Sequence, residues 1–123
     1  MTLVAHSIAV GFAVEAAQEL EKEGISCEVV NLRTLRPLDT ASIINSVKKT
    51  NRLVTVEGGW PQCGIGSEIC AVVMESEAFD YLDAPVHRVT GADIPTPYAK
   101  NLEDQAFPTA QNVIRTVKGV LNL

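Results

Sequence analysis

The sequence predicts an α/β protein with a mostly parallel sheet and helices on both faces. Short apolar runs rich in β-branched residues alternate along the chain with segments whose apolar residues recur at helical spacing. Such alternation produces parallel pairing, because each helix carries the chain back along one face of the sheet. The 123 residues are one domain's length, so a single domain spanning residues 1–123 is expected.

Four segments are expected as strands. Each is bounded by polar residues or by Gly and Pro, and each is too short for a buried helix. They cover residues 2–6, 27–32, 53–57 and 85–90.

Four helices are expected between and after these strands. Their apolar faces carry, in chain order, Ala13, Ala16, Ala17 and Leu20; Ile43, Ile44 and Val47; Ile65, Ile69, Val72 and Val73; and Val113, Ile114, Val117 and Leu121. Ser7 is expected to cap the first helix, and Gly24 to end it. Asp39 is the expected N-cap of the second helix, and Pro108 is the expected first residue of the last helix.

Residues 91–107 form one long irregular stretch, which predicts a functional role or a surface position.

Composition and charge exclude several classes of protein. The formal net charge is −5, whereas proteins that wrap nucleic acid carry clustered Lys and Arg. No apolar run approaches the roughly 20 residues of a membrane helix, and the first residues do not resemble a secretory signal. Three widely spaced cysteines fit a reducing compartment better than a disulfide framework. An acidic surface suits a basic protein partner.

Ligands of parallel α/β proteins bind beyond the carboxyl ends of the strands. Residues expected there are His6 and Ser7, Arg33 and Thr34, and the segments 57–60 and 90–93. The glycine-rich segment 57–67 is the densest feature, and a loop of this kind can cradle an anion at a helix N-terminus. It matches neither the dinucleotide fingerprint nor a P-loop, because Ile69 stands at the third glycine position and no Gly-Lys-Ser/Thr follows.

Two interpretations of that loop stay open at this point. One is an anion or nucleotide site at Gly58–Ser67; the other is a tight turn that lets Trp60 pack against a neighbour. A third hypothesis makes Cys63 a reactive thiol near a helix N-terminus. The only histidines, His6 and His87, complete neither a nucleophile–base pair nor a metal site. The residues therefore favour a binding or assembly role, or a part of a larger enzyme.

Several long motifs make the chain recognisable. They are residues 31–39 (NLRTLRPLD), 56–62 (VEGGWPQ), 82–85 (LDAP), 88–99 (RVTGADIPTPYA) and the closing 121–123 (LNL). With them, essentially the whole chain resembles the C-terminal third of the beta subunits of the pyruvate dehydrogenase decarboxylating component. Residues 92–99 are similar to the pyruvate branch rather than the branched-chain branch. Cys63 and Thr96 depart from the family pattern, where a bulkier residue and a methionine are expected.

The resemblance implies the transketolase C-terminal domain fold, a three-layer α/β/α sandwich. The family's sheet begins with an antiparallel edge strand, which this chain is expected to lack. Four strands would remain in the order second, first, third, fourth, and the strand at residues 27–32 would be an uncovered edge. Exposed edges pair with other chains, so self-association or modest stability is expected.

The resemblance also implies what the longer enzyme does. It uses thiamine diphosphate and magnesium to decarboxylate pyruvate, and it passes the acetyl group to the lipoyl arm of an acyltransferase. The family's cofactor-activating glutamate lies in an N-terminal domain with no match here. The resemblance therefore assigns no catalytic, cofactor-binding or metal residue to this chain, and the chain alone is expected to be inactive. Glu57 is not the counterpart of that glutamate.

What the family implies for this domain is assembly. The expected partners are the alpha subunit, a second beta subunit and the basic subunit-binding domain of the acyltransferase core. The positions matching the acyltransferase contact are Asp83 and the terminal carboxylate of Leu123. The expected location is the mitochondrial matrix, with the bacterial cytoplasm as the alternative.

Overall fold

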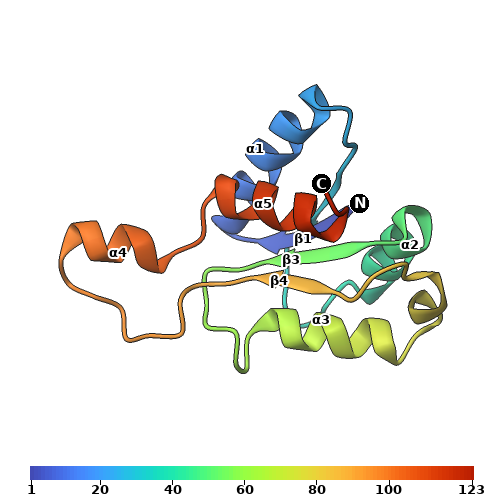
Figure 1. Ribbon diagram of the computed structural model, residues 1–123. Helices are drawn as coiled ribbons and strands as arrows, with labels where there is room; N and C mark the ends of the chain where they lie inside the picture. The colour runs from blue at the N-terminus through green and yellow to red at the C-terminus, as the bar shows by residue number, and fades with distance from the viewer.

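A computed structural model describes all residues from 1 to 123. Its four strands form one all-parallel sheet in the order β2-β1-β3-β4. Helices cover both faces (Figure 1). The elements are β1 (Thr2–His6), α1 (Ala9–Lys22), β2 (Glu28–Leu32), α2 (Thr40–Thr50), β3 (Leu53–Val56), α3 (Ile65–Met74), the 3₁₀ helix η1 (Glu77–Tyr81), β4 (His87–Val89), α4 (Lys100–Ala106) and α5 (Ala110–Val120). The predicted fold class and strand order are confirmed.

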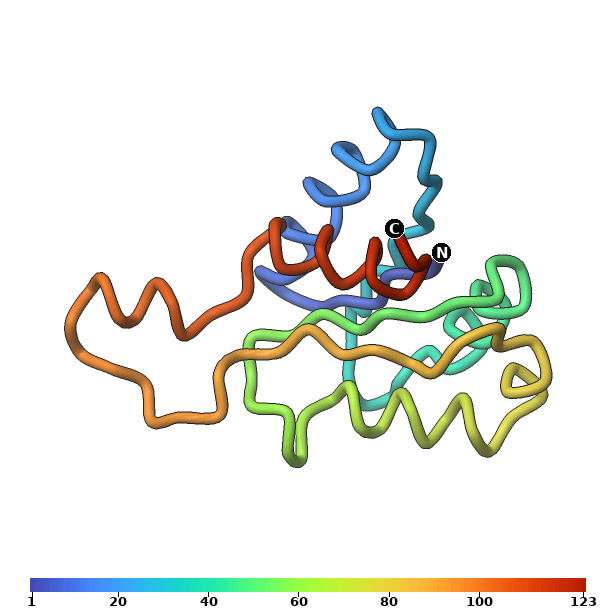
Figure 2. Tube along the Cα trace, in the orientation of Figure 1, coloured from blue at the N-terminus to red at the C-terminus, as the bar shows by residue number.

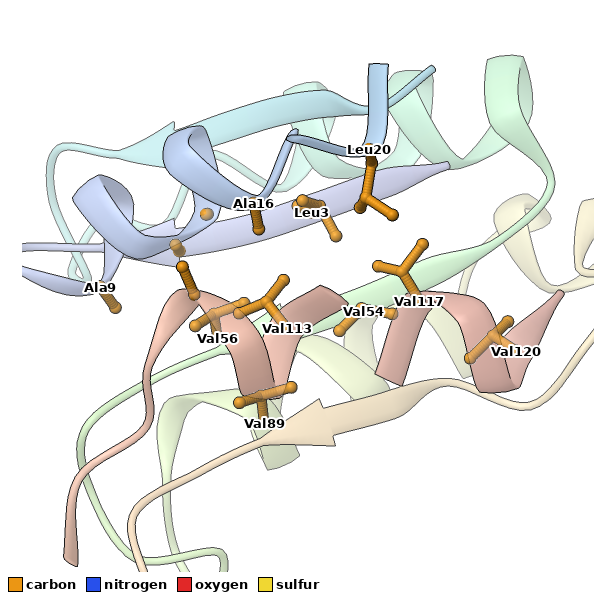
Figure 3. Packing of buried hydrophobic residues seen from close by; sticks show 13 residues of the cluster. Leu3, Ala9, Ala16, Leu20, Val54, Val56, Val89, Val113, Val117 and Val120 are labelled. Atoms are coloured by element: carbon orange, nitrogen blue, oxygen red, sulfur yellow. The ribbon is translucent and has the colours of Figure 1, made fainter. Parts of the chain in front are cut away.

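Alternation along the strands divides the core into two layers. Leu3 and Ala5 of β1 point to the face covered by α1 and α5, together with Val54 and Val56 of β3 (Figure 3). Three buried alanines of α1, Ala9, Ala13 and Ala16, belong to the same layer. Small side chains let a helix approach a sheet closely, as the alanine-rich pattern predicts.

The other layer lies between the sheet and α2, α3 and η1. Val4 of β1 and Leu53 of β3 meet Ile43 of α2 and Ile69 of α3 there, and all four are fully buried. The strand residues in this layer alternate along the sequence with those in the first layer, so β1 and β3 are buried on both faces. That arrangement is typical of central strands in a parallel sheet.

Helix ends follow local side-chain chemistry, with two corrections. Asp39 caps α2, because its carboxylate accepts the Ser42 N–H at 3.0 Å. The prediction that Ser7 caps the first helix is wrong: α1 follows Ile8 and has no side-chain cap. The prediction that the last helix begins at Pro108 is also wrong. Thr109 is the N-cap of α5 and forms a reciprocal capping box with Asn112. The two side chains accept hydrogen bonds from the backbone amides of Asn112 and Thr109, which a proline side chain cannot do.

Two short helices were not predicted. Both η1 and α4 carry few buried residues, so apolar periodicity gives no signal for them. Helix α4 lies within the stretch expected to be irregular, and it projects from the body at the end of a long loop (Figure 2). We call residues 91–107 the arm. No helix in the protein is long and apolar enough to span a membrane.

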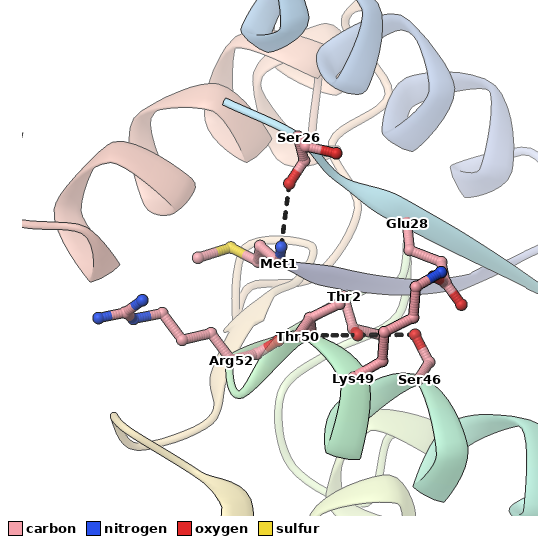
Figure 4. A network of polar contacts seen from close by, with 8 residues as sticks. All are labelled: Met1, Thr2, Ser26, Glu28, Ser46, Lys49, Thr50 and Arg52. Carbon is pink, nitrogen blue, oxygen red and sulfur yellow. Dashed lines mark hydrogen bonds and ion pairs between the residues drawn. The ribbon is translucent and has the colours of Figure 1, made fainter. Parts of the chain in front are cut away.

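Polar contacts tie the amino ends of the strands together (Figure 4). The buried Thr2 hydroxyl lies 2.7 Å from the Ser46 hydroxyl and 2.6 Å from that of Thr50, so β1 is joined to α2. The Met1 ammonium donates to the Ser26 carbonyl at 3.0 Å. These contacts fix β1 against α2 and against the segment that precedes β2.

The outer edge of β2 is unpaired, as the resemblance led us to expect. The Glu28 N–H points inward and donates to the Met1 carbonyl at 2.8 Å. Backbone groups alternate along a strand, so the N–H and C=O groups of Val29 and Asn31 point outward. Unpaired groups in a row are a template for another strand.

We therefore predict that the chain self-associates through β2, and that Asn31→Pro weakens this association. Asn31 is exposed and its N–H faces away from β1, so proline removes an outward donor without breaking the internal ladder. Sedimentation velocity over a concentration series measures the effect, with circular dichroism as the check on folding. Equal association of both proteins, or a monomeric parent, would contradict the prediction.

Candidate functional site

A buried acidic side chain lies at the carboxyl end of β3. Glu57 is only 2% exposed, and its Oε2 accepts the Gly66 N–H at 2.5 Å. Gly66 is the second residue of α3, so this carboxyl group takes up one of the free amides at the helix N-terminus. A carboxylate is favoured there by the helix dipole. The glycine-rich loop therefore wraps around a side chain of its own chain.

The spacing of the glycines follows from this contact. A Cβ at Gly64 would lie 2.0 Å from Oε1 of Glu57 and 2.7 Å from the Trp60 carbonyl oxygen. A Cβ at Gly66 would lie 2.7 Å from Oε2 of the same carboxyl group. The space in which a cradled phosphate would bind is thus filled by an acidic group. This geometry argues against an anion or nucleotide site at Gly58–Ser67.

Backbone contacts join the glycine loop to the base of the arm. The Gly91 N–H donates to the Gly59 carbonyl at 2.8 Å, and a Cβ on Gly91 would lie 2.5 Å from the Gly58 carbonyl oxygen. The Trp60 indole N–H donates to the Ile94 carbonyl at 3.0 Å. Trp60 thus packs against a neighbouring loop, as the tight-turn interpretation expected. The Glu57 loop positions the arm.

The arm exposes large apolar side chains. Tyr98 is fully exposed, and Ile94, Leu102 and Phe107 are each more than 40% exposed. Trp60, at the base of the arm, is 54% exposed. Several large apolar side chains exposed on one segment favour a role of that segment as a protein interface.

The remaining chemical candidates do not come together. Cys63 is exposed at φ 58° and precedes the N-cap of α3, while His6 and His87 lie on β1 and β4. Burial raises the pKa of the Cys27 and Cys70 thiols above the ordinary value, which makes both less reactive. No group of three His, Cys, Asp or Glu side chains is placed to hold a metal ion.

Asp83 lies at the opposite edge of the sheet, just before β4. Its N–H donates to the Asn51 carbonyl at 2.8 Å, and the Asn51 amide donates to the Tyr81 carbonyl at 2.8 Å. Asn51 is the left-handed C-cap of α2, so the end of that helix fixes the Asp83 backbone. The Asp83 side chain is exposed and forms no ion pair, which leaves its carboxylate free for a partner.

Asp83 also borders an open apolar groove of about 560 Å³. The other lining residues are Cys70, Met74, Phe79, Leu82, Ala84, Pro85 and Val86. This groove was not predicted from the sequence. Met74 and Phe79 are exposed although large and apolar. In the sequence, Met74 is a large apolar residue outside the predicted apolar face of α3. That position was the available sign of an exposed apolar contact.

Leu123 is held at the same edge by the end of α5. The Leu123 N–H donates to the Lys118 carbonyl at 2.9 Å, and Asn122 adopts a left-handed conformation at φ 59°. These are the features of a Schellman motif, which fixes the direction of the last residue. Ala84 follows Asp83, and Leu121 lies two residues before Leu123. Both pack against the core cluster between the sheet and helices α1 and α5, so the same part of the core supports both predicted contact residues.

We predict that Gly64→Ala lowers the free energy of unfolding by about 2–4 kcal/mol, because the methyl group collides with Glu57 and with backbone. Gly119→Ala is the matched control: nothing lies within 4 Å of its added Cβ, and alanine favours the α5 helix by about 0.5–1 kcal/mol. Urea unfolding followed by circular dichroism measures both changes. A Gly64→Ala protein as stable as the parent would show that Glu57 does not occupy this space.

The chain matches a known protein family and several known proteins. A model of the family described as "Transketolase, C-terminal domain" matches residues 1–113. The chain is 60% identical over all 123 residues to the mitochondrial pyruvate dehydrogenase E1 component subunit beta of Bos taurus, 61% identical to that of Mus musculus and, over 124 aligned residues, 58% identical to that of Saccharomyces cerevisiae. It spans 34% of the length of each of these relatives.

A solved structure agrees with the sequence comparison. The chain matches a "Split gene transketolase, inactive beta4 tetramer" with a TM-score of 0.82 and 32% identity, over 99% of this chain and 38% of that one. The family match covers more than nine-tenths of the residues, and the fold agrees with it. The chain therefore belongs to the transketolase C-terminal domain family.

Proposed function

We propose that this chain is the C-terminal assembly and docking domain of a pyruvate dehydrogenase E1 beta subunit. The observation that carries the proposal is the 58–61% identity, over the whole chain, to E1 beta subunits of animals and yeast. In the longer enzyme, pyruvate would be decarboxylated and its acetyl group passed to a lipoyl-bearing acyltransferase. The relatives are named mitochondrial, and the mitochondrial matrix is the proposed location.

The chemistry of that enzyme does not fit the residues of this domain. Thiamine diphosphate and magnesium need a diphosphate-binding metal site, and no suitable cluster of ligands is present. The one buried carboxyl group, Glu57, is engaged with the Gly66 amide. We therefore place the cofactor in the remainder of the enzyme and derive no catalytic step from this chain.

The amino edge of the sheet is our proposed docking face for the acyltransferase. It offers the exposed Asp83 carboxylate, which forms no ion pair within the protein, and Leu123 as the second proposed contact. A basic subunit-binding domain would form charge-assisted hydrogen bonds with these groups. The adjoining groove with Met74 and Phe79 adds apolar contact, and the negative charge of Asp83 at its margin would speed encounter with a basic partner.

The carboxyl edge is our proposed contact with the other E1 subunits. The arm exposes Ile94, Tyr98, Leu102 and Phe107, and its helix α4 makes no extensive contact with another helix or strand. A seven-residue helix is marginal by itself in water, so a partner surface would stabilise it. The alpha subunit and a second beta subunit are the proposed partners. Separate faces for subunits and acyltransferase allow both to bind at once.

We predict salt-sensitive binding of the acyltransferase's subunit-binding domain to this chain, with Asp83→Ala weakening it about tenfold, the effect of one charge-assisted contact. Raising the salt from about 0.05 to about 0.5 M should weaken the parent and leave the variant less affected. Isothermal titration calorimetry measures the dissociation constants. Asp80→Ala is the matched control, because Asp80 is an exposed acid three residues away in η1.

Three results would decide the matter. Weakening by Asp83→Ala but not by Asp80→Ala supports the docking face. Equal weakening of binding by both variants would show a general effect of negative charge and would contradict the assignment of Asp83 as a contact residue. Binding that both variants leave unchanged would place the docking face elsewhere.

We also predict that the chain alone does not decarboxylate pyruvate in the presence of thiamine diphosphate and magnesium, because it supplies no cofactor site. Release of labelled carbon dioxide from [1-¹⁴C]pyruvate is the measurement, with an intact E1 as the positive control. Turnover above that of the cofactor alone would overturn the assignment of a non-catalytic domain.

A further inference from the structure

The apolar groove beside Asp83 lies where α3 ends and the chain returns through η1 toward β4 (Figure 1). Asp83 is the only charged residue that lines it, and the other lining residues are apolar side chains of α3, η1 and the segment 82–86. An ion pair at Asp83 alone needs no apolar hollow beside it. The groove therefore points to a partner that brings an apolar side chain as well as a charge.

The floor and the margin of the groove differ in burial. Leu82 and Val86 are partly buried and pack against the core cluster between the sheet and helices α2 and α3, so the floor continues the protein core. Met74 and Phe79 also line the groove, but they are 59% and 49% exposed. Apolar area that stays in water at the edge of a core is area that a partner's apolar side chain would cover.

Contacts within the protein hold the groove in shape before any partner binds. The Ser76 hydroxyl accepts the Ala78 N–H at 3.3 Å and caps η1, and Ala78 is fully buried. Lys48 of α2 forms an ion pair with Glu77 at 2.9 Å, and its ammonium lies 5.3 Å from the centre of the Tyr81 ring. These contacts fix η1 against α2. A preformed groove lowers the entropy that binding would otherwise lose.

The charge around the groove is negative. Residues 75–83 carry four acidic side chains and no Lys, Arg or His. Only Glu77 has a cation within the protein, namely Lys48. The exposed acids without an ion pair are Glu75, Asp80 and Asp83. An apolar groove in acidic surroundings complements a segment that is both apolar and basic, and it disfavours an acidic one.

We propose that the groove receives one large apolar side chain of the acyltransferase's subunit-binding domain, between Met74 and Phe79, from a segment whose neighbouring Lys or Arg pairs with Asp83. The apolar side chain supplies most of the affinity, and the charge pair sets the orientation and the rate of association. The inference rests on the proposed docking function. It names the feature of the partner that the docking face recognises and assigns Met74 and Phe79 as the residues that select it.

Nuclear magnetic resonance tests the contact directly. The chain has two methionines and one tryptophan, so labelling with ¹³C at the methionine methyl groups and ¹⁵N at the indole gives few signals to assign. Unlabelled subunit-binding domain is the probe. We expect a saturable shift of the Met74 methyl signal and nuclear Overhauser effects from it to aliphatic or aromatic protons of the domain. The Trp60 indole signal, at the opposite edge of the sheet, should not shift.

Variants measured by isothermal titration calorimetry test the energy of the contact. Phe79→Ala should weaken binding about tenfold, and Met74→Gln about threefold, with the length and helix propensity of the side chain kept. Both losses should persist at about 0.5 M salt, because salt screens charges and not apolar contacts. Leu35→Ala is the matched control, since Leu35 is 45% exposed but lies beyond the carboxyl end of β2. Circular dichroism checks the folding of each variant.

Three results would overturn the inference. If the domain binds and the Met74 methyl signal does not shift, or if Phe79→Ala and Met74→Gln bind as tightly as the parent, the docking function stands and the groove has no part in it. Equal weakening by Leu35→Ala would show a general loss of apolar surface rather than a contact at the groove. If the parent chain does not bind the domain at all, the proposed docking function fails, and the groove inference fails with it.

Discussion

The arrangement of the carboxyl edge depends on one buried contact, that of the Glu57 carboxyl group with the N-terminus of α3. It sets the start of the helix and requires glycine at positions 64 and 66, where a Cβ would overlap the carboxyl oxygens. Burying an acidic group is unfavourable unless hydrogen bonds replace water, and the Gly66 amide supplies one. Glu57 therefore has a structural role in this domain.

The structure places the arm and the predicted docking residues at opposite edges of the sheet. Hydrogen bonds join the Glu57 loop to Gly91 and Ile94, so the arm leaves the sheet at a fixed place and extends away from the body (Figures 1 and 2). At the other edge, the caps of α2 and α5 hold Asp83 and Leu123. If the proposed function holds, this separation allows one partner to bind without displacing another.

Much of this could be predicted from the sequence, and the rest could not for identifiable reasons. Strand patterns and the Asp39 cap are local signals, so the four strands and α2 were within reach, whereas the order of the strands came from the family resemblance. Helix α4 and η1 escaped because each buries only one residue. The fit of Gly64 and Gly66 around Glu57 is a contact across a loop, which spacing alone does not reveal. The choice of Asp83 and Leu123 came from family resemblance, since neither stands in a chemical motif.

The central claim is that the amino edge of the sheet receives the acyltransferase while the arm serves the other subunits. Hydrogen–deuterium exchange of this chain, with and without the subunit-binding domain, tests it most directly. The account predicts slower exchange at residues 82–86 and 118–123 and unchanged exchange across residues 91–107. Protection confined to the arm and the Glu57 loop would contradict it and would exchange the roles of the two edges.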